Sequence, residues 1–264
     1  MTRTAQPAPI PRQAHVRRPR IAVGTDGTVW GDAALDWALR HAATQSASVD
    51  VFAAETSDDH AITRRLTAYR WLFTTVTVSP DSSVRTLLEA STDHDTLVLG
   101  YRGRRHGPFG LGRSVLPVVT ESRCDTVVVR GEPRAVQGEH RWITAALGGK
   151  HDDAVVRRAV QFAVRTRSKL RLVHAVPLPG AHTVPISTEP ADVLEHAHDL
   201  VREMAPDLTP SLRLVRSQPH EAVRSSERSD LLVLGPGSLP GKLSVITSTA
   251  LHMAPCPVLV VKPF

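Results

Sequence analysis

The chain has 264 residues, of which 41% are hydrophobic and 22% charged, and its formal net charge is +6. This composition is typical of a soluble globular protein, and the length is sufficient for two domains that each bury a core. The sequence contains no apolar run near the roughly 20 residues that a membrane helix needs, and its amino terminus lacks the apolar segment of a secretory signal, so we expect a cytoplasmic protein without membrane contact. Its two cysteines, Cys124 and Cys256, exclude a disulfide framework and lack metal-ligand spacing.

The first 20 residues combine five arginines with four prolines and contain no aromatic residue. This composition predicts a disordered basic tail over residues 1–19. Because side chains that could stack on bases are missing, we expect a solvated tail in preference to one that binds nucleic acid or anionic lipid.

A β-α-β unit follows the tail. Residues 20–24 form an apolar run that predicts a buried strand, and the turn over residues 25–32 opens a helix. One face of that helix carries Ala34, Leu35, Ala38, Leu39 and Ala42, the spacing of a segment packed on a sheet. Residues 48–54 resume strand character.

The same pattern returns 121 residues later, without a gap, over about 35 positions. The helix face becomes Val155, Val156, Ala159, Val160 and Ala163, all apolar, and the second strand becomes residues 169–175. Later elements also recur: residues 95–100 match 230–235, and residues 124–130 match 256–262. This internal repeat predicts two homologous halves.

Each half alternates strand and helix, which predicts an α/β fold made of two tandem doubly wound (Rossmann-like) domains, each with a five-stranded parallel sheet. The expected domains are residues 20–130 and 140–264, joined by a linker over residues 131–139. The expected strands are residues 20–24, 48–54, 73–78, 96–99 and 126–130, and then 141–146, 169–175, 211–216, 230–234 and 257–262.

A loop rich in glycine and arginine follows the fourth strand, over residues 100–114. It contains five glycines, four arginines and no acidic residue, so it is suited to an anion such as a phosphate. A solvated basic loop is the alternative. If strands one and four are neighbours, this loop and Asp26, which follows strand one, line one crevice at the carboxyl ends of the strands. A carboxylate there can accept ribose hydroxyls while the loop holds phosphates.

Three stretches resemble the universal stress protein family: VGTDGT at 23–28, GYRG at 100–103 with Gly112 beyond it, and APCPVLVV at 254–261. The resemblance covers residues 20–264 as two tandem copies. It implies a cofactor, ATP, with a divalent cation if it is bound, in the first domain. By the same resemblance Asp26 contacts the ribose, Ala54 lines the adenine, Gly100 and Gly103 form the loop, and Gly112 holds the phosphates.

The phosphate loop departs from the family pattern G-x2-G-x9-G-[ST]. Eight residues separate Gly103 from Gly112, and Arg113 takes the place of the hydroxyl residue, with Ser114 next. Pro117 fits the first turn of a helix, so we expect that helix to start with Ser114 as its N-cap. Ser114 then replaces the missing hydroxyl, and Arg113 near the helix amino terminus is consistent with a bound anion.

The second half lacks the ribose acceptor, because Leu147 stands at the position of Asp26. Ser238 replaces Gly103 and Ser244 the third glycine, so we expect no ATP site there. The sequence Gly241-Lys242 does not complete a Walker A motif. The histidines lack zinc-ligand spacing, and no nucleophile or general base stands out, so no metal site and no catalytic residue are predicted.

These features predict a tandem universal stress protein that acts as a regulatory module in stress adaptation, with nucleotide as its partner. Two alternatives remain open: a protein interaction module that binds no nucleotide, and a weak ATPase by analogy of fold. The resemblance also implies that strands 126–130 and 258–262 pair within the chain as a pseudo-dimer. Whether two chains associate further as a homodimer, and which protein partner is contacted, stays open.

Overall fold

The computed structural model describes residues 17–79, 83–103, 110–176, 190–216, 221, 223, 226–237, 239 and 241–262. Three parts of the chain named above lie outside these residues: residues 1–16 of the expected tail, residues 104–109 of the glycine- and arginine-rich loop, and Ser238. The end of the expected tail is described, and it lies against the first domain. Arg17 donates a hydrogen bond of 2.9 Å to the carbonyl of Asp93, and the Arg18 guanidinium lies 4.3 Å from the centre of the Phe73 ring.

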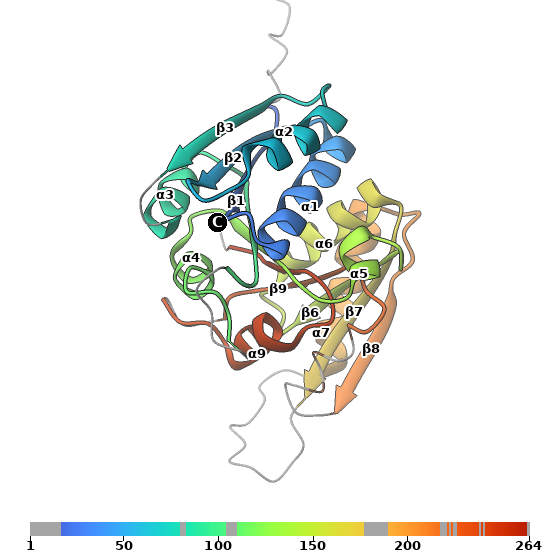
Figure 1. Cartoon of the computed structure of the whole chain (residues 1–264). Coiled ribbons are helices and arrows are strands. Elements are labelled where there is room, and N and C mark those ends of the chain that lie inside the picture. Colours follow the sequence, from blue (N-terminus) through green and yellow to red (C-terminus); the bar gives the residue numbers. More distant parts are fainter. Residues whose placement is uncertain are drawn as a thin grey trace, which may run out of the picture.

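Strands and helices alternate along the chain (Figure 1). The first half contains β1 (Arg20–Thr25), α1 (Val29–Gln45), β2 (Ser48–Ala54), α2 (Asp59–Ala68), β3 (Thr74–Ser79), α3 (Ser83–Ala90), β4 (Thr96–Gly100), α4 (Val115–Glu121) and β5 (Asp125–Val129). The second half contains β6 (Trp142–Leu147), α6 (Asp153–Thr166), β7 (Lys169–Val176), α7 (Pro190–Met204), β8 (Ser211–Arg216), β9 (Leu231–Leu234), α9 (Val245–Met253) and β10 (Val258–Val260). Each expected strand is present, with bounds that differ by at most two residues.

The strands form one sheet in the order β3-β2-β1-β4-β5-β10-β9-β6-β7-β8. Strands within each half are parallel, as expected, and β5 and β10 pair antiparallel, with Val128 opposite Val258. The expected pairing of the last strands is therefore confirmed. Its consequence is that the two five-stranded sheets are continuous and form a single ten-stranded sheet.

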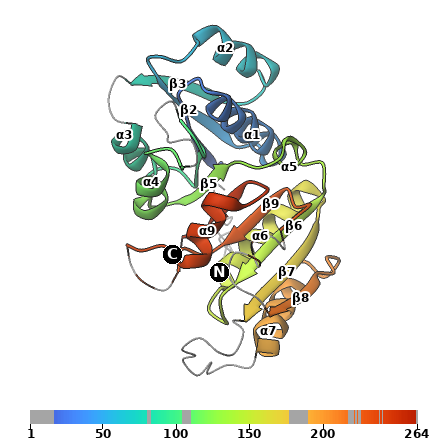
Figure 2. The ribbon, with the colours of Figure 1, turned by 60° about the horizontal axis from the view of Figure 1, so that its bottom comes forward.

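Helices cover both faces of this sheet (Figure 2). One core cluster joins α1, α2, α6 and α7 to one face, and a second joins α3, α4 and α9 to the other. The apolar faces expected on α1 and α6 are buried: the five residues named on α1 are fully buried, and those on α6 are at most 3% exposed. Because both faces are covered at the centre of the sheet, β5, β9 and β10 are buried along their whole length, whereas the outer strands β3 and β8 are largely exposed.

The expected linker contains a short helix, α5 (Pro133–Gln137), which ends at Gly138 in the left-handed conformation. Buried polar contacts also join the halves. Asp125 is fully buried, forms an ion pair with Arg158 and accepts a hydrogen bond of 3.0 Å from the backbone N–H of Lys262. The halves therefore share a core and a charge network across the β5–β10 junction.

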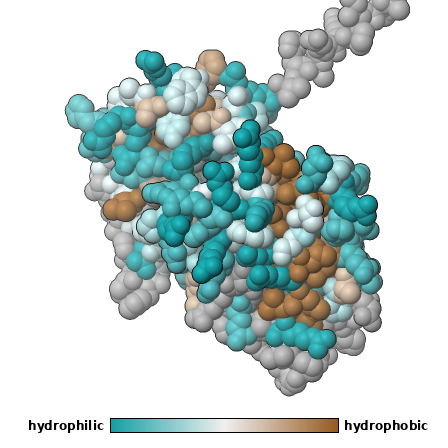
Figure 3. Space-filling view, turned by 90° about the vertical axis from the view of Figure 1, so that its right-hand side faces the viewer, coloured by the Kyte–Doolittle hydropathy of each residue, from teal (hydrophilic) through white to brown (hydrophobic). Residues whose placement is uncertain are grey.

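The outer strands of the sheet expose apolar side chains. Val76 and Val78 of β3 are 45% and 49% exposed, and Leu212 and Leu214 of β8 are each 43% exposed. Figure 3 faces the side on which β8 lies in Figure 1 and shows a strip of hydrophobic side chains among hydrophilic ones. Among the described helices, none is long and apolar enough to cross a membrane.

Candidate functional site

A cavity of about 550 Å³ lies at the carboxyl ends of the strands in the first half. β1 lies between β2 and β4, so the winding direction reverses between β1 and β4, where ligands bind in open α/β sheets. The cavity volume falls within the range of small-molecule sites. All seven residues that the sequence singled out line it: Asp26, Ala54, Gly100, Gly103, Gly112, Arg113 and Ser114.

Asp26 directly follows β1 and lies at the amino terminus of α1. One of its carboxylate oxygens, Oδ1, accepts hydrogen bonds from the backbone N–H and the hydroxyl of Thr28, at 3.2 and 2.7 Å. Thr28 in turn caps α1, because its hydroxyl accepts the backbone N–H of Gly31. The turn that begins the helix therefore fixes the orientation of the Asp26 carboxylate toward the cavity.

Two glycines of the loop pack against each other and against Asp26. A Cβ atom at Gly103 would lie 2.7 Å from Oδ2 of Asp26, and one at Gly112 would lie 3.0 Å from the backbone nitrogen of Gly103. Side chains at these positions would therefore displace their neighbours. The close approach explains why glycine is needed on both sides of the loop, whose middle lies outside the described residues.

Tyr101 anchors the start of this loop to the sheet. Its backbone N–H donates to the carbonyl of Val129 at 3.0 Å, and its carbonyl accepts the N–H of Gly112 at 2.8 Å. Its ring meets the Trp30 ring edge-on, and the guanidinium groups of Arg102 and Arg130 lie 4.9 and 5.0 Å from its centre. Burial lowers the pKa of Arg130 to about 10, so this arginine is charged at neutral pH.

Ser114 precedes α4, as expected, but the expected capping bond is absent. Its φ and ψ of −81° and −20° are already helical, and its side chain makes no capping hydrogen bond to α4. A capping residue needs an extended backbone so that its oxygen can reach the N–H two or three residues on, and the loop does not provide that conformation here. The predicted position of Ser114 as the N-cap residue of α4 is confirmed, its side-chain capping bond is not formed, and Ser114 lines the cavity.

The opposite wall of the cavity comes from β2 and α3. Ala54 ends β2, and Glu55 and Thr56 follow it, while Val84 and Leu87 of α3 close the apolar side. Of these residues, only Ala54 was predicted from the sequence. Glu55 follows a strand whose carboxyl end borders the cavity, so the topology of the sheet was the signal that could have found it.

The charged residues that line the cavity are Arg102, Arg113, Asp26 and Glu55. The arginines belong to the loop after β4, and the carboxylates follow β1 and β2; Asp26 lies against the loop, because a Cβ atom at Gly103 would lie 2.7 Å from its Oδ2. Such an arrangement suits a ligand with an anionic end and an end that donates hydrogen bonds. Within the described part of the chain, no group of three or more His, Cys, Asp or Glu side chains could hold a metal ion.

The equivalent crevice of the second half already contains a carboxylate of the chain. Oδ2 of Asp152 accepts the backbone N–H groups of Gly148 and Gly149 at 2.5 and 3.2 Å. A Cβ atom at Gly235, just after β9, would lie 3.6 Å from Oδ1 of the same residue. Asp152 therefore lies between the ends of β6 and β9 and uses N–H groups that could otherwise bind an anion.

No protein-family model matches the chain, and no curated protein matches its sequence. Solved structures do match it over nearly its whole length. A universal stress protein from Archaeoglobus fulgidus has a TM-score of 0.67 at 16% identity and covers 92% of this chain and 96% of its own. A putative universal stress protein from Pseudomonas aeruginosa has a TM-score of 0.64 at 15% identity, with 93% and 94% covered.

The cytoplasmic domain of a prokaryotic cation chloride cotransporter is also similar, with a TM-score of 0.57 at 13% identity and 92% and 95% of the two chains covered. The fold is therefore shared with a domain of a different kind of protein, and it does not by itself specify a function.

The sheet order and the crevice define a tandem, doubly wound α/β protein with an open cavity in its first half. The chain has the fold of the universal stress proteins, in agreement with the resemblance of its sequence motifs.

Proposed function

We propose that this protein is a tandem universal stress protein that binds an adenine nucleotide such as ATP in its first half and acts as a regulatory module in stress adaptation. The observation that carries the proposal is the convergence of three distant segments on one cavity. The turn after β1, the end of β2 and the loop after β4 supply all seven residues predicted from the sequence.

The proposed roles follow from the chemistry of each wall. Asp26 accepts the ribose hydroxyls, because its carboxylate is oriented by Thr28 and reaches the loop. Ala54 and the apolar residues near it contact the adenine, and Gly100 and Gly103 let the backbone approach the ligand. Gly112, Arg113 and Ser114 hold the phosphates, to which arginine contributes charge-assisted hydrogen bonds. A divalent cation, if present, enters with the phosphates.

We propose that the second half binds no nucleotide. Two observations support this difference between the halves. Leu147 cannot accept a ribose hydroxyl, and the Asp152 carboxylate lies where phosphates would bind and would repel them. The second half then serves as a folded partner that stabilises the first half through the shared sheet.

Binding, and not efficient catalysis, is the proposed activity. A general base must lie within hydrogen-bond reach of the group that it deprotonates. Asp26 is the carboxylate that the proposal assigns to ribose, and Glu55, which follows β2, is assigned no contact with the phosphates. No residue of the cavity is left with an assigned role in activating water for hydrolysis.

The experiment that tests the proposal is a calorimetric titration of ATP, with Mg²⁺, into the wild-type protein and into Asp26→Ala. Removal of a charged hydrogen-bond acceptor costs about 1.5–3 kcal/mol of binding free energy, so we expect the affinity for ATP to fall at least tenfold. Asp93→Ala, an exposed carboxylate of the same half, is the matched control and should bind ATP as the wild type does.

Three outcomes separate the functions considered. Equal affinity in the wild type and Asp26→Ala contradicts the proposed site. Absence of ATP binding, together with no adenine nucleotide released on heat denaturation, favours an interaction module without nucleotide. Steady ATP turnover that Gly103→Val abolishes identifies an ATPase, because a valine there displaces the Asp26 carboxylate.

A further inference from the structure

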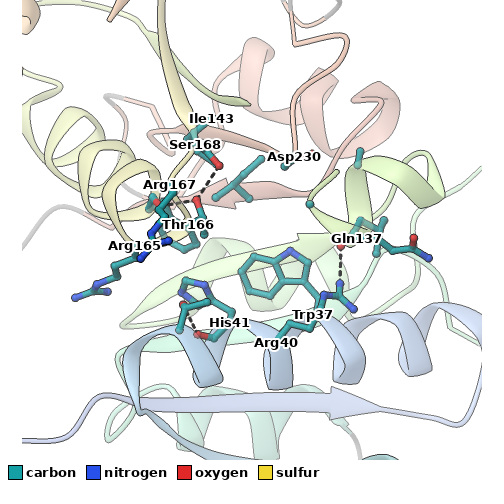
Figure 4. A pocket seen from close by; sticks show the side chains of 16 residues that line it. Trp37, Arg40, His41, Gln137, Ile143, Arg165, Thr166, Arg167, Ser168 and Asp230 are labelled. Atoms are coloured by element: carbon teal, nitrogen blue, oxygen red, sulfur yellow. Dashed lines mark hydrogen bonds between the residues drawn. The ribbon is translucent and has the colours of Figure 1, made fainter. Parts of the chain in front are cut away.

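A second cavity lies between the two halves, away from the nucleotide crevice. Its volume is about 270 Å³, and it is lined by α1, α5, the end of α6 and the first residues of β6 and β9 (Figure 4). This cavity shares no lining residue with the nucleotide crevice, so the proposed function gives it no role.

Three stacked rings form one wall of the cavity. The imidazole of His41 is parallel to the ring of Phe162, with an angle of 4° and a distance of 4.4 Å between centres, and it stacks on the Trp37 indole at 5.0 Å. All three residues are at most 8% exposed. Figure 4 shows the indole of Trp37 and the imidazole of His41 side by side on α1. This wall suits a flat aromatic molecule.

The polar atoms of this wall have no internal partners. Within the part of the chain that the structure describes, neither ring nitrogen of His41 nor the indole N–H of Trp37 takes part in a hydrogen bond, although the two residues are only 6% and 8% exposed. Burial lowers the pKa of His41 to about 3, so the ring is neutral and has one N–H donor and one acceptor. The fully buried side-chain N and O atoms without a partner, among the described residues, do not include these nitrogens, so they are accessible, and a ligand in the cavity can supply an acceptor for the indole N–H.

The cavity is also positively charged. Arg40, Arg165 and Arg167 line it, and none of them forms an ion pair with a carboxylate among the described residues. Arg40 is partly buried, which lowers its pKa, and its hydrogen bond is to the carbonyl of Val136, at 2.6 Å. Asp36, one turn earlier on α1, forms its ion pair with Arg65, although its charge also acts on Arg40 and opposes the lowering of the Arg40 pKa.

One carboxylate, that of Asp230, lines the same cavity, and both of its oxygens already accept hydrogen bonds. Asp230 accepts the backbone N–H groups of His140 and Arg141 at 2.9 and 2.6 Å. Among the described residues, neither Asp230 nor another carboxylate forms an ion pair with these three arginines, and an anionic group on a ligand would do so.

We propose that this cavity binds a small aromatic carboxylate. The ring of the ligand packs on Trp37, His41 and Phe162, and its carboxylate accepts hydrogen bonds from the nitrogen groups of Trp37, His41 and Arg40. Because α1 and α5 belong to the first half and the linker while α6, β6 and β9 belong to the second, the ligand contacts both halves at once.

The probe for this site is 2-naphthoate, and the readout is the indole N–H resonances of the ¹⁵N-labelled full-length protein. The sequence has four tryptophans, and Trp37→Phe identifies the resonance of Trp37 by its loss. We expect 2-naphthoate to shift the Trp37 resonance saturably and to leave that of Trp71, which is 65% exposed, unchanged.

Two variants test the polar contacts. His41→Phe keeps the stacked ring and removes both nitrogens, and Arg40→Gln removes the charge. Each should weaken 2-naphthoate binding about tenfold. The neutral analogue 2-naphthamide should bind the wild type more weakly than 2-naphthoate by a similar factor.

Arg64→Gln, on the exposed face of α2, is the charge-matched control and should bind 2-naphthoate as the wild type does. Asp26→Ala should also leave this binding unchanged, because the nucleotide crevice is separate. The proposal is overturned if the Trp37 resonance does not shift up to the solubility limit of the probe. It is equally overturned if 2-naphthamide binds as tightly as 2-naphthoate, or if Asp26→Ala rather than Arg40→Gln abolishes binding.

Discussion

His41 is a titratable side chain that the fold keeps neutral. Burial lowers its pKa from 6.5 to about 3, and the nearby charges of Arg165 and Arg158 act in the same direction. The unfolded chain binds a proton at this residue below pH 6.5, whereas the folded chain does not until about pH 3. Stability contributed by neutral His41 is therefore complete above pH 6.5 and decreases as the pH falls through this window.

We expect acidification below about pH 6 to decrease the free energy of unfolding more steeply in the wild type than in His41→Phe. The difference between the two slopes should be about 1.4 kcal/mol per pH unit. Urea denaturation of both proteins between pH 7 and about pH 4.5 measures this difference. Both proteins contain the same carboxylates, so their contributions cancel. Parallel pH profiles would show that His41 is protonated in the folded state.

A residue of the nucleotide site could be predicted from the sequence where its position at the end of a strand is enough to bring it to the cavity. Asp26 follows a strand, and Gly100 and Gly103 follow another, so the alternation of strands and helices was enough to bring them together. Ser114 could be predicted as the N-cap residue of α4, but not the lack of its side-chain capping bond, because that bond depends on a backbone angle that the loop sets.

Gly131 shows how one residue determines the path between two elements. It follows β5 with a φ of +91°, and a Cβ atom there would lie 2.1 Å from the carbonyl oxygen of Pro255, just before β10. The next residue, Glu132, donates its backbone N–H to that same carbonyl at 3.0 Å. The chain can therefore leave β5 beside β10 only if residue 131 has no side chain.

We expect Gly131→Ala to lower the free energy of unfolding by about 3 kcal/mol or more, from backbone strain together with the clash. Gly138→Ala is the matched control, because Gly138 also has a positive φ, of +78°, but no atom lies within 4 Å of its Cβ position. This control should cost about 1–2 kcal/mol. Equal losses in urea denaturation would contradict the close approach to Pro255.

The elements themselves were predictable because their apolar runs are long and periodic. Each strand was expected within one or two residues, and the buried faces of α1 and α6 were identified from the repeat. The short helix α5 was not expected, since residues 131–139 carry proline and glycine at positions that are equally typical of an irregular linker.

The whole molecule is organised by the antiparallel pairing of β5 with β10. Thr126, Val127 and Val128 pair with Val260, Leu259 and Val258, and this junction makes two sheets into one. The order of strands within each half follows from the rules of α/β folds, whereas the junction was expected only from the family resemblance. Apolar periodicity does not specify which strands meet at the junction, because β5, β9 and β10 are all buried along their whole length.

The cavity between the halves could not have been predicted from the sequence. Trp37 lies on a helix face that reads as core, and the pairing of His41 with Phe162 joins residues from both halves. The cavity is formed by residues of both halves and so exists only where the two halves meet. Its position also means that the two halves can be bridged by one ligand.

The measurement that tests the central claim most directly is a crystal structure of the full chain grown with ATP and Mg²⁺. The account predicts one nucleotide per chain, in the first-half crevice, with its ribose within hydrogen-bonding distance of Asp26 and its phosphates beside Gly112, Arg113 and Ser114. A nucleotide bound beside Asp152 in the second half, or a first-half crevice that remains without nucleotide at saturating ATP, would contradict it.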